Sequence, residues 1–483
     1  METTTIAAIS TPAGVGGIAV IRLSGPRALA VADMVWKGKT LADVPTHTAH
    51  LGTLLDADGM PLDSAVATVF RGPRSFTGED TVEFSVHGSE WIQRKVVESL
   101  IENGAVAAEP GEFTRRAFIN GRLDLAQAEA VADLIASSSR AAHRIAMRQI
   151  DGTFSSRLEE LRQQLVELAS LLELELDFSE EDVEFADRQK LSELTDTTLA
   201  VISRLADSYK AGRAFKQGVP VVIAGVPNAG KSTLLNALLD TEKAIVSDTP
   251  GTTRDIIEDT VEIDGMLFRF LDTAGLRDTD DHVEQIGIDR ARHALGKAAI
   301  VLWLIDPTQP LAPQQEQMQR YATSLPDATI LTVITKSDLA PGSPDRGEPS
   351  TFTDAGLSTP GAPALTISAS TGAGLSTSGA PALTISASTG AGLSTLKAAL
   401  NAEATKDHRP DTDIIITNAR HYAQLRAGAE SLQRVREALT TSLPPDLIAQ
   451  DVRDALHHLG LLTGAVTTDT LLSTIFARFC IGK

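Results

Sequence analysis

Residues 225–232 read GVPNAGKS and match the pattern GxxxxGKS. They follow the apolar run VPVVIAGV, which starts at Val219, and precede the helical pattern TLLNALL. A glycine-rich loop between a buried strand and a helix cradles phosphates with its backbone N–H groups and the helix N-terminus. In this pattern Lys231 reaches the terminal phosphates and the Ser232 hydroxyl coordinates Mg²⁺. The segment therefore predicts a nucleotide-binding domain with a parallel α/β fold.

Three shorter motifs follow in the order typical of GTP-binding domains: PGTTRD (250–255), DTAG (272–275) and TKSD (335–338). A threonine of the first motif, Thr253, can close on Mg²⁺ and the γ-phosphate, and Asp272 can hold the Mg²⁺ shell. Asp338 can accept both N–H groups of the guanine edge, which adenine does not present, while Lys336 packs along the ring. Together the motifs predict GTP as the ligand.

The residue after DTAG is Leu276, where Ras-type GTPases carry a glutamine that orients the attacking water. Leucine has no polar atom for this task, so another residue must align the water. We predict that Glu284, in the helical start DDHVEQIGIDRA, is the catalytic residue and acts through a second water molecule. The alternative is that Glu284 is a solvated carboxylate in the first turn of a helix.

An 18-residue segment, Gly356–Ala373, recurs as Gly374–Ala391 with one substitution. Each copy contains ISAS, which is similar to the last guanine-binding motif of such domains. We favour the second copy because it precedes the helix-forming run TLKAALNAE; the first copy, at 368–369, is the alternative. The residues predicted to bind GTP are Asn228, Ala229, Gly230, Lys231, Ser232, Thr233, Ser247, Asp248, Thr249, Pro250, Gly251, Thr252, Thr253, Asp272, Thr273, Ala274, Gly275, Thr335, Lys336, Ser337, Asp338, Ser386, Ala387 and Ser388.

The rest of the chain changes character on either side of this domain. Short β-rich runs, Gly17–Leu23 and Ala65–Phe70, alternate with Gly/Pro turns near the N-terminus, whereas amphipathic helical periodicity begins at Leu123 and returns after about residue 402. We expect a multidomain α+β and α/β protein in which a Ras-like P-loop GTPase domain is inserted into a helical domain. The predicted parts are an N-terminal α+β domain (1–121), the helical domain (122–215 and 402–483) and the inserted domain (216–401).

Composition limits the classes of function. The 483 residues include 43 basic and 63 acidic ones, a net charge of -20, so any contact with nucleic acid must be local or supplied by a partner. A single cysteine, Cys480, excludes an internal disulfide. The N-terminus lacks the basic and apolar regions of a signal peptide, and no apolar run reaches ~18 residues. We expect a cytoplasmic protein without a membrane segment.

Several blocks resemble the MnmE (TrmE) family of tRNA modification GTPases, in that family's order and over nearly the whole chain. They are TPAGVGGIAVIRLSG, SFTGEDTVEFSVHGS, PGEFTRRAFINGRLDLAQAEAVADLI, GVPNAGKSTLLNAL, GTTRD, DTAGLRDTDDHVEQIGIDRA and FCIGK. The resemblance implies an N-terminal domain that binds folate and forms a homodimer. It also implies a heterotetramer with the FAD-dependent MnmG/GidA protein. Its reaction adds a carboxymethylaminomethyl or aminomethyl group to C5 of the wobble uridine of certain tRNAs, using a 5-formyl or 5,10-methylene tetrahydrofolate.

The resemblance also assigns ligands. Arg22, Glu83, Arg122 and Lys483 match the tetrahydrofolate contacts, although the family usually has lysine where Arg122 stands. Arginine and lysine suit the folate glutamate tail, and a carboxylate suits the pterin N–H donors. From the sequence alone, surface ion pairing is the alternative for these arginines and Glu83.

Potassium is the second cation that the resemblance implies, beside Mg²⁺ at Ser232 and Thr253. The implied potassium ligands are Asn228, Ser247, Thr249 and Thr252. Otherwise Asn228 would be a residue that tolerates an irregular loop.

Thr335 replaces the asparagine more usual before the lysine of the base-reading motif. Its hydroxyl still offers a hydrogen bond, so we expect weaker anchoring with retained guanine preference.

Cys480 resembles the family's near-terminal cysteine. It is a candidate reactive thiol, as a nucleophile or carrier, or else a small buried apolar residue.

The competing function is a GTP-controlled assembly or binding module without its own role in RNA chemistry. The N-terminal block and FCIGK argue against it, because a simple switch has no need of them.

Overall fold

A computed structural model describes residues 4–177, 188–241, 258–271, 298–322, 328–339, 366–368, 376–378, 383–410, 413–441, 445–477, 479 and 481–482. The chain divides into two compact units. The first unit comprises Met1–Ala136, Ala146–Ser203 and Ala423–Lys483, and the second comprises Ser137–Ile145 and Arg204–Tyr422.

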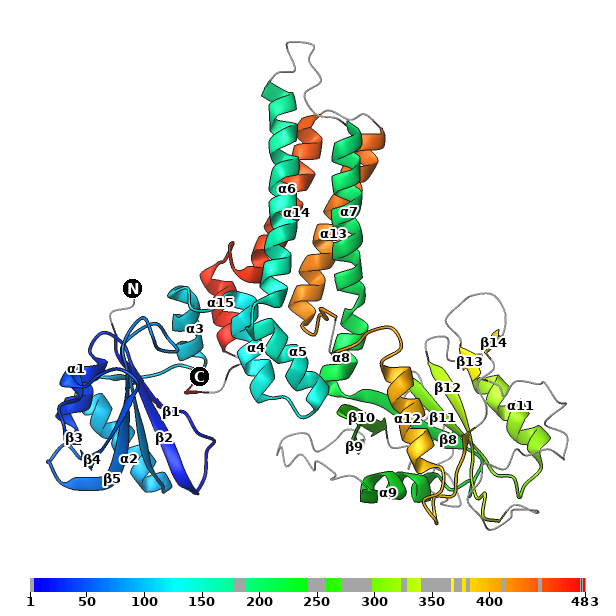
Figure 1. The fold of residues 1–483 in the computed structure, drawn as a ribbon, viewed down its shortest axis with the longest axis horizontal. Coiled ribbons are helices and arrows are strands. Elements are labelled where there is room, and N and C mark those ends of the chain that lie inside the picture. Colours follow the sequence, from blue (N-terminus) through cyan, green and yellow to red (C-terminus); the bar gives the residue numbers. More distant parts are fainter. Residues whose placement is uncertain are drawn as a thin grey trace, which may run out of the picture. The chain divides into compact units, whose positions relative to one another are not determined.

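The first unit contains a seven-stranded sheet in the order β3-β4-β5-β6-β2-β1-β7 (Figure 1). Every neighbouring pair is antiparallel except β1 and β7, which are parallel. The two runs expected to be strands lie within β2 and β5. The strands are β1 (Ile6–Ile9), β2 (Gly16–Ser24), β3 (Trp36–Lys37), β4 (Thr48–Leu55), β5 (Pro61–Phe70), β6 (Thr81–Gly88) and β7 (Val106–Ala107).

Three α-helices and a 3₁₀ turn accompany this sheet: α1 (Ala28–Met34), α2 (Glu90–Glu102), α3 (Glu112–Ile119) and η1 (Leu41–Asp43). Because strand side chains alternate between faces, Ile21 of β2 and Phe84 of β6 point into a core that also contains residues of α1 and α2. Their neighbours Arg22 and Glu83 therefore point to the opposite face of the sheet. This alternation places the two residues on a partly exposed surface.

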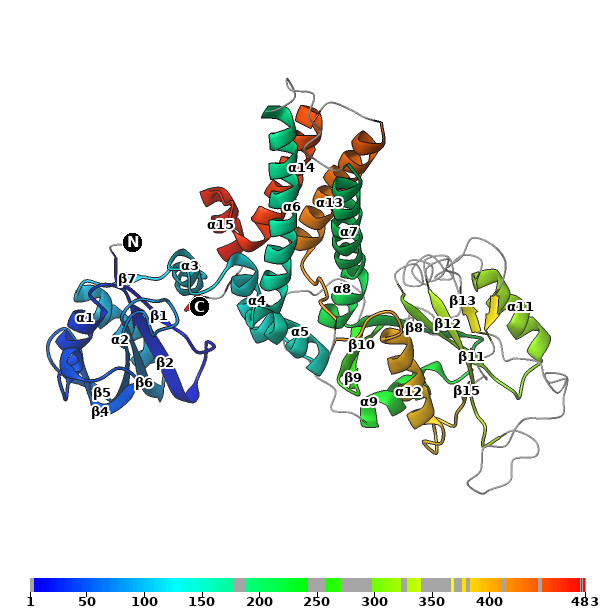
Figure 2. The same ribbon diagram turned by 45° about the horizontal axis from the view of Figure 1, so that its top comes forward.

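The helical part of the first unit contains long helices that lie side by side, as Figures 1 and 2 show for α6, α7, α13 and α14. The buried leucines of α6 lie three or four residues apart, which gives the helix one apolar face. The helical pattern from Leu123 is interrupted at residues 136–139, where three serines follow an alanine. The helices that lie wholly or partly in the first unit are α4 (Leu125–Ile135), α5 (Arg140–Ile150), α6 (Thr153–Asp177), α7 (Arg188–Asp207), α13 (Ala419–Thr440), α14 (Pro445–Thr463) and α15 (Asp469–Phe476).

The second unit contains an eight-stranded sheet, with the path β14-β13-β12-β11-β8-β10-β9 and β15 paired to β12. Strands β10, β8, β11, β12 and β15 are parallel to their neighbours in this group, and β9 is antiparallel to β10. The strands are β8 (Val219–Gly225), β9 (Glu258–Ile263), β10 (Met266–Leu271), β11 (Ile300–Ile305), β12 (Thr329–Ile334), β13 (Thr366–Ser368), β14 (Ser376–Ser378) and β15 (Leu383–Thr384).

Helices cover both faces of this sheet, so its central strands are apolar on both sides. Alternate residues of β11 divide between two cores: Leu302 packs with residues of α9 and α12, and Trp303 packs with residues of α11. Phe215 of α8 joins the first of these cores. The helices are α8 (Tyr209–Gln217), α9 (Lys231–Thr241), α11 (Leu311–Ala322) and α12 (Leu393–Ala404).

The expected fold class is confirmed: an α+β domain, a helical domain and a P-loop α/β domain are all present. Across the described ranges, no helix is both long and apolar enough to span a membrane.

Candidate functional site

The GVPNAGKS segment forms the turn between β8 and α9. Gly225 has φ 147°, and a Cβ there would lie 2.6 Å from the carbonyl oxygen of Leu304. Gly230 has φ 94°, and Asn228 adopts a positive φ of 61°. Only glycine reaches such angles without cost, and asparagine tolerates the left-handed region better than most residues. The glycine spacing of the motif is therefore required by the backbone path of the loop.

Lys231 begins α9, and its ammonium bends back over the loop. Nζ donates to the carbonyl oxygens of Gly225 (3.1 Å) and Val226 (3.0 Å). Ser232 and Thr233 are exposed in the first turn of the helix, where the positive end of the helix dipole favours anions. The loop thus combines a cation, exposed hydroxyls and a helix N-terminus, which together suit a polyphosphate.

The TKSD segment follows β12 and lies against the same loop. The Thr335 hydroxyl is within hydrogen-bond distance of two carbonyl oxygens, those of Ala229 (2.8 Å) and Ile305 (3.2 Å). Threonine at this position therefore still joins the base-reading motif to the phosphate loop. Lys336 has a positive φ of 51°, and its ammonium contacts the Asp306 carboxylate at 2.7 Å.

Asp338 is exposed, and two serine hydroxyls orient its carboxylate. Ser386 donates to Oδ1 at 2.8 Å and Ser388 to Oδ2 at 3.4 Å. Hydrogen bonding from Ser386, with a smaller effect from Ser388, lowers the pKa of Asp338 below its ordinary value. The carboxylate is therefore ionised at neutral pH, the state that accepts two N–H donors.

The two copies of the duplicated segment have different places along β12. Strand β15 of the second copy runs parallel to β12, with Val333 opposite Leu383, and leads into the loop that contains Ser386. The first copy supplies β13, which pairs antiparallel with the start of β12 at Thr329. The second copy therefore forms the strand and loop beside Asp338, as its position before a helix indicated.

Several predicted GTP-site residues lie outside the described residues. They are Ser247, Asp248, Thr249, Pro250, Gly251, Thr252, Thr253, Asp272, Thr273, Ala274, Gly275 and Glu284. Cys480 and Lys483 also lie outside them. Their predicted roles stay predictions.

A second group of predicted residues lies in the first unit. Arg22 of β2 and Glu83 of β6 are directly opposite in the strand register, and Arg22 Nε donates to Glu83 Oε1 at 2.8 Å. The Arg22 guanidinium also lies 5.5 Å from the ring centroids of Phe76 and Phe113. Both ion-pair partners are partly exposed. The arrangement presents a cation, a carboxylate and an aromatic ring at one surface.

Another predicted folate contact, Arg122, lies near this region. The Arg122 side chain packs beside Gly78, in the loop that contains Phe76. At the other end of the chain, the Ser10 hydroxyl donates to the carbonyl oxygen of Gly482 at 3.0 Å. Ser10 directly follows β1, the strand next to β2, and the predicted ligand Lys483, which follows Gly482 in the sequence, lies outside the described residues.

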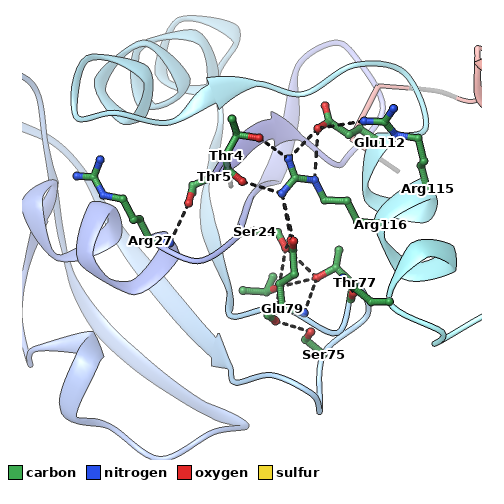
Figure 3. A network of polar contacts seen from close by, with 12 residues as sticks. Thr4, Thr5, Ser24, Arg27, Ser75, Thr77, Glu79, Glu112, Arg115 and Arg116 are labelled. Atoms are coloured by element: carbon green, nitrogen blue, oxygen red, sulfur yellow. Dashed lines mark hydrogen bonds and ion pairs between the residues drawn. The ribbon is translucent and has the colours of Figure 1, made fainter. Parts of the chain in front are cut away.

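A buried polar network holds the Phe76 loop (Figure 3). Arg116 is 1% exposed and contacts two carboxylates, Glu112 at 2.8 Å and Glu79 at 3.3 Å. Its Nη1 also donates to the carbonyl oxygen of Thr4 at 2.7 Å. Ser24 donates to Glu79 at 3.0 Å. Arg116 therefore fixes the loop to α3 and to the N-terminal strands.

The predicted site residues do not include Asp306, Phe76, Phe113 or Arg116. Asp306 carried a signal, because it is the first polar residue after the buried run IVLWLI and so stands at the carboxyl end of a parallel strand. The other three belong to a site assembled across strands and a helix. No local spacing in the sequence reveals those contacts.

Known proteins provide an independent comparison. A family model described as the MnmE helical domain matches residues 125–480, and one described as the GTP-binding protein TrmE N-terminus matches residues 5–122. A relative named tRNA modification GTPase MnmE, from Parabacteroides distasonis, is 46% identical over 99% of this chain and 100% of its own length. A relative of the same name from Cytophaga hutchinsonii is 45% identical over 100% of this chain and 98% of its own length.

A solved structure of the G domain of T. maritima FeoB covers 39% of this chain and 99% of its own, with 22% identity and a TM-score of 0.25. That likeness is too weak to carry a conclusion. The two family models and the full-length relatives agree with the order of sequence blocks and with the fold, and they show that this chain belongs to the MnmE (TrmE) family.

Proposed function

We propose that this chain is a tRNA modification GTPase, the function in the printed name of its full-length relatives. The observation that carries the proposal is the contact between Thr335 and the carbonyl oxygen of Ala229. This contact fixes the base-reading loop to the phosphate loop. A single guanine nucleotide can therefore be held by Lys231 at one end and by Asp338 at the other.

Guanine selection rests on Asp338 and its two serine partners. The ionised carboxylate accepts the N1 and N2 hydrogens of guanine, and the Ser386 and Ser388 hydroxyls hold it in place. Adenine offers no such donor pair, so a site built on Asp338 discriminates against ATP. Binding of GDP without binding of ADP is the expected result in calorimetry.

Cations complete the hydrolytic site in this proposal. Ser232 and Thr253 would hold Mg²⁺, and Asn228 with Ser247, Thr249 and Thr252 would hold potassium. The described residues fit this assignment, because Ser232 and Asn228 are exposed at the phosphate loop. A cation bound there neutralises charge that develops on the phosphates.

Glu284 is the proposed group that orients water. GTP hydrolysis should be faster in KCl than in NaCl, and Glu284→Ala should mainly lower turnover. Equal rates in both salts, or an unaffected Glu284→Ala variant, would remove this mechanism.

The surface formed by Arg22, Glu83 and Phe76 is the proposed site for a tetrahydrofolate, in its 5-formyl or 5,10-methylene form. Arg22 or Arg122 pairs with the anionic tail and Glu83 accepts from the pterin N–H groups. Lys483 would close the site, since Gly482 is held at Ser10. The ligand would supply the one-carbon unit. Stabilisation of the purified protein by 5-formyltetrahydrofolate tests this assignment.

Dimerisation through the N-terminal domain is proposed on the open face of its sheet. Ile18 and Leu51 are 70% and 75% exposed. Strand register places both on the face that also carries Arg22. A second copy would bury these apolar side chains. Light scattering that finds a monomer at micromolar concentration would contradict this part of the proposal.

The proposed reaction modifies C5 of the wobble uridine, in a cytoplasmic complex with the FAD-dependent MnmG/GidA protein. The net charge of -20 favours a partner that supplies much of the tRNA contact. Comparing wobble-uridine modification in tRNA from cells with and without the gene tests this function. Unchanged modification would leave a GTP-controlled assembly module as the function.

A further inference from the structure

Asp306 stands at the end of β11 and is completely buried, with 0% exposure. Its Oδ1 accepts from the backbone N–H and the hydroxyl of Thr308, at 3.0 and 2.6 Å. Its Oδ2 accepts from Lys336 Nζ at 2.7 Å and from Gln309 at 3.1 Å. The Gln314 side-chain amide accepts from the Asp306 backbone N–H and donates to the Asp306 carbonyl oxygen, each at 2.9 Å. The carboxylate is therefore immobilised on every side.

Burial by itself would raise the pKa of Asp306, but the hydrogen bonds from Lys336 and Thr308 outweigh it and lower the pKa below its ordinary value. A buried carboxylate of this kind keeps its charge only while its cationic partner stays in place. Asp306 and Lys336 are thus bound together as a charged pair.

Lys336 has two features that call for such a partner. Its backbone adopts a positive φ of 51°, a region that is costly for a lysine and persists only where neighbours fix it. Its long side chain would otherwise sample many rotamers and lose that freedom on contact with a ligand. A partner that holds the ammonium beforehand removes part of this cost.

We propose that Asp306 is a positioning residue for guanine nucleotides, which acts by holding Lys336 so that its aliphatic stem lies along the face of the base. This inference rests on the proposed GTP-binding function. In this inference the contact with the base has two parts. Asp338 reads the guanine edge, and the pair of Asp306 and Lys336 supplies a ring contact that is the same for any purine with that ring geometry.

The test measures GDP and IDP affinity of the purified full chain by calorimetry, below the unfolding temperature of each variant. IDP lacks the 2-amino group of guanine, so the GDP-to-IDP ratio reports on Asp338 and not on Lys336. Asp306→Asn should weaken both nucleotides about tenfold and leave their ratio unchanged. Lys336→Met should behave in the same way, and the double variant should be no weaker than the single ones.

A matched control separates positioning from local stability. Thr308→Val removes a hydroxyl that contacts Asp306 but leaves the Lys336 contact, so it should lower the unfolding temperature with little change in GDP affinity. If Asp306→Asn does not fold, Asp306→Glu, which displaces the carboxylate by one methylene, takes its place with the same expectation.

Unchanged GDP affinity in the Asp306 variant would overturn the inference. So would losses that add in the double variant, or a fall in the GDP-to-IDP ratio, since these would indicate independent roles or a displaced Asp338. A wild-type chain that binds neither nucleotide would remove the proposed function itself and this inference with it. Wild-type binding with an unaffected Asp306 variant would remove the inference alone.

Discussion

The two candidate sites of this chain are encoded in different ways. In the second unit, residues 225–232 supply the phosphate loop as one continuous segment, and its positive-φ positions define the backbone path. In the first unit, Arg22 and Glu83 come from separate strands and meet only because the register of β2 and β6 places them opposite each other. A loop that binds through its backbone leaves a local motif in the sequence. A site made of side chains on a sheet face does not.

The two regions also differ in what holds them. Arg116, buried between two carboxylates, supports the loop beside Arg22. The nucleotide loops are joined by hydrogen bonds, such as that of Thr335 to Ala229, and by an ion pair whose cation, Lys336, is partly exposed. We therefore expect stability effects to dominate when the first site is disturbed and affinity effects to dominate at the second.

The largest effect is expected at Arg116. Arg116→Met removes the buried cation that contacts both Glu112 and Glu79, while Glu112 keeps a 3.9 Å contact with Arg115, and it should cost about 3–5 kcal/mol of unfolding free energy in the first unit. Urea unfolding measures it, and GDP affinity should not change. Arg157→Met, which breaks an exposed pair with Glu160, is the control and should cost less than about 1 kcal/mol. Similar losses of unfolding free energy in both variants would refute the difference expected between the buried and the exposed ion pair.

The next effect separates the two copies of the duplication. Ala387→Asp places a second carboxylate in the loop beside Asp338, against the core of the second unit, and should weaken GDP binding on the order of 100-fold. Ala369→Asp makes the same change in the first copy and should leave GDP affinity unaltered. Loss of binding in Ala369→Asp alone would mean that the first copy reads the base.

Arg22→Ala tests the sheet-face site. Removal of the guanidinium should weaken binding of 5-formyltetrahydrofolate about tenfold, because a charge-assisted contact is lost. Arg94→Ala, on the exposed side of α2 beside Glu98, provides a control of equal charge. GTP hydrolysis should stay the same in both. Equal folate affinity in wild type and Arg22→Ala would exclude this surface.

A smaller effect concerns pH. Because the pKa of Asp338 is lowered, its carboxylate is charged at any pH above that pKa. The part of the GDP affinity that depends on this charge is present there and is lost as the pH falls through the pKa. Ser386→Ala removes the main cause of the lowering, so its GDP affinity should start to fall at a higher pH than that of wild type. Titration of GDP binding from about pH 6 to about pH 3, a range that extends below the ordinary Asp pKa of about 3.9, measures the difference. Coincident profiles would show that Ser386 does not tune Asp338.

The smallest effect is expected on deletion of Gly356–Ala373. One intact copy remains, and shortening a connection changes the loop entropy by only about 0.6 kcal/mol per twofold change in length. GDP affinity should stay within about twofold of wild type. A larger loss would show that the nucleotide site depends on both copies.

The sequence by itself determined the P-loop domain and the alternation of strands and helices, and it singled out Asp338 as the residue proposed to read guanine. These features depend on local properties, namely glycine at positive φ, apolar runs on both sides of a loop, and a helix directly after Lys231. The strand runs near Gly17 and Ala65 were predictable for the same reason, since their alternation with turns is visible in the chain itself.

Only the tertiary structure decided which side chains meet. Arg22 faces Glu83 through strand register, Arg116 is buried against Glu79 and Glu112 from two elements, and Lys336 pairs with Asp306 from a neighbouring strand. The register of β12 with β15 also placed the second copy of the duplication beside Asp338. Two nearly identical copies have nearly the same local propensities, so only long-range pairing can give them different positions in the fold.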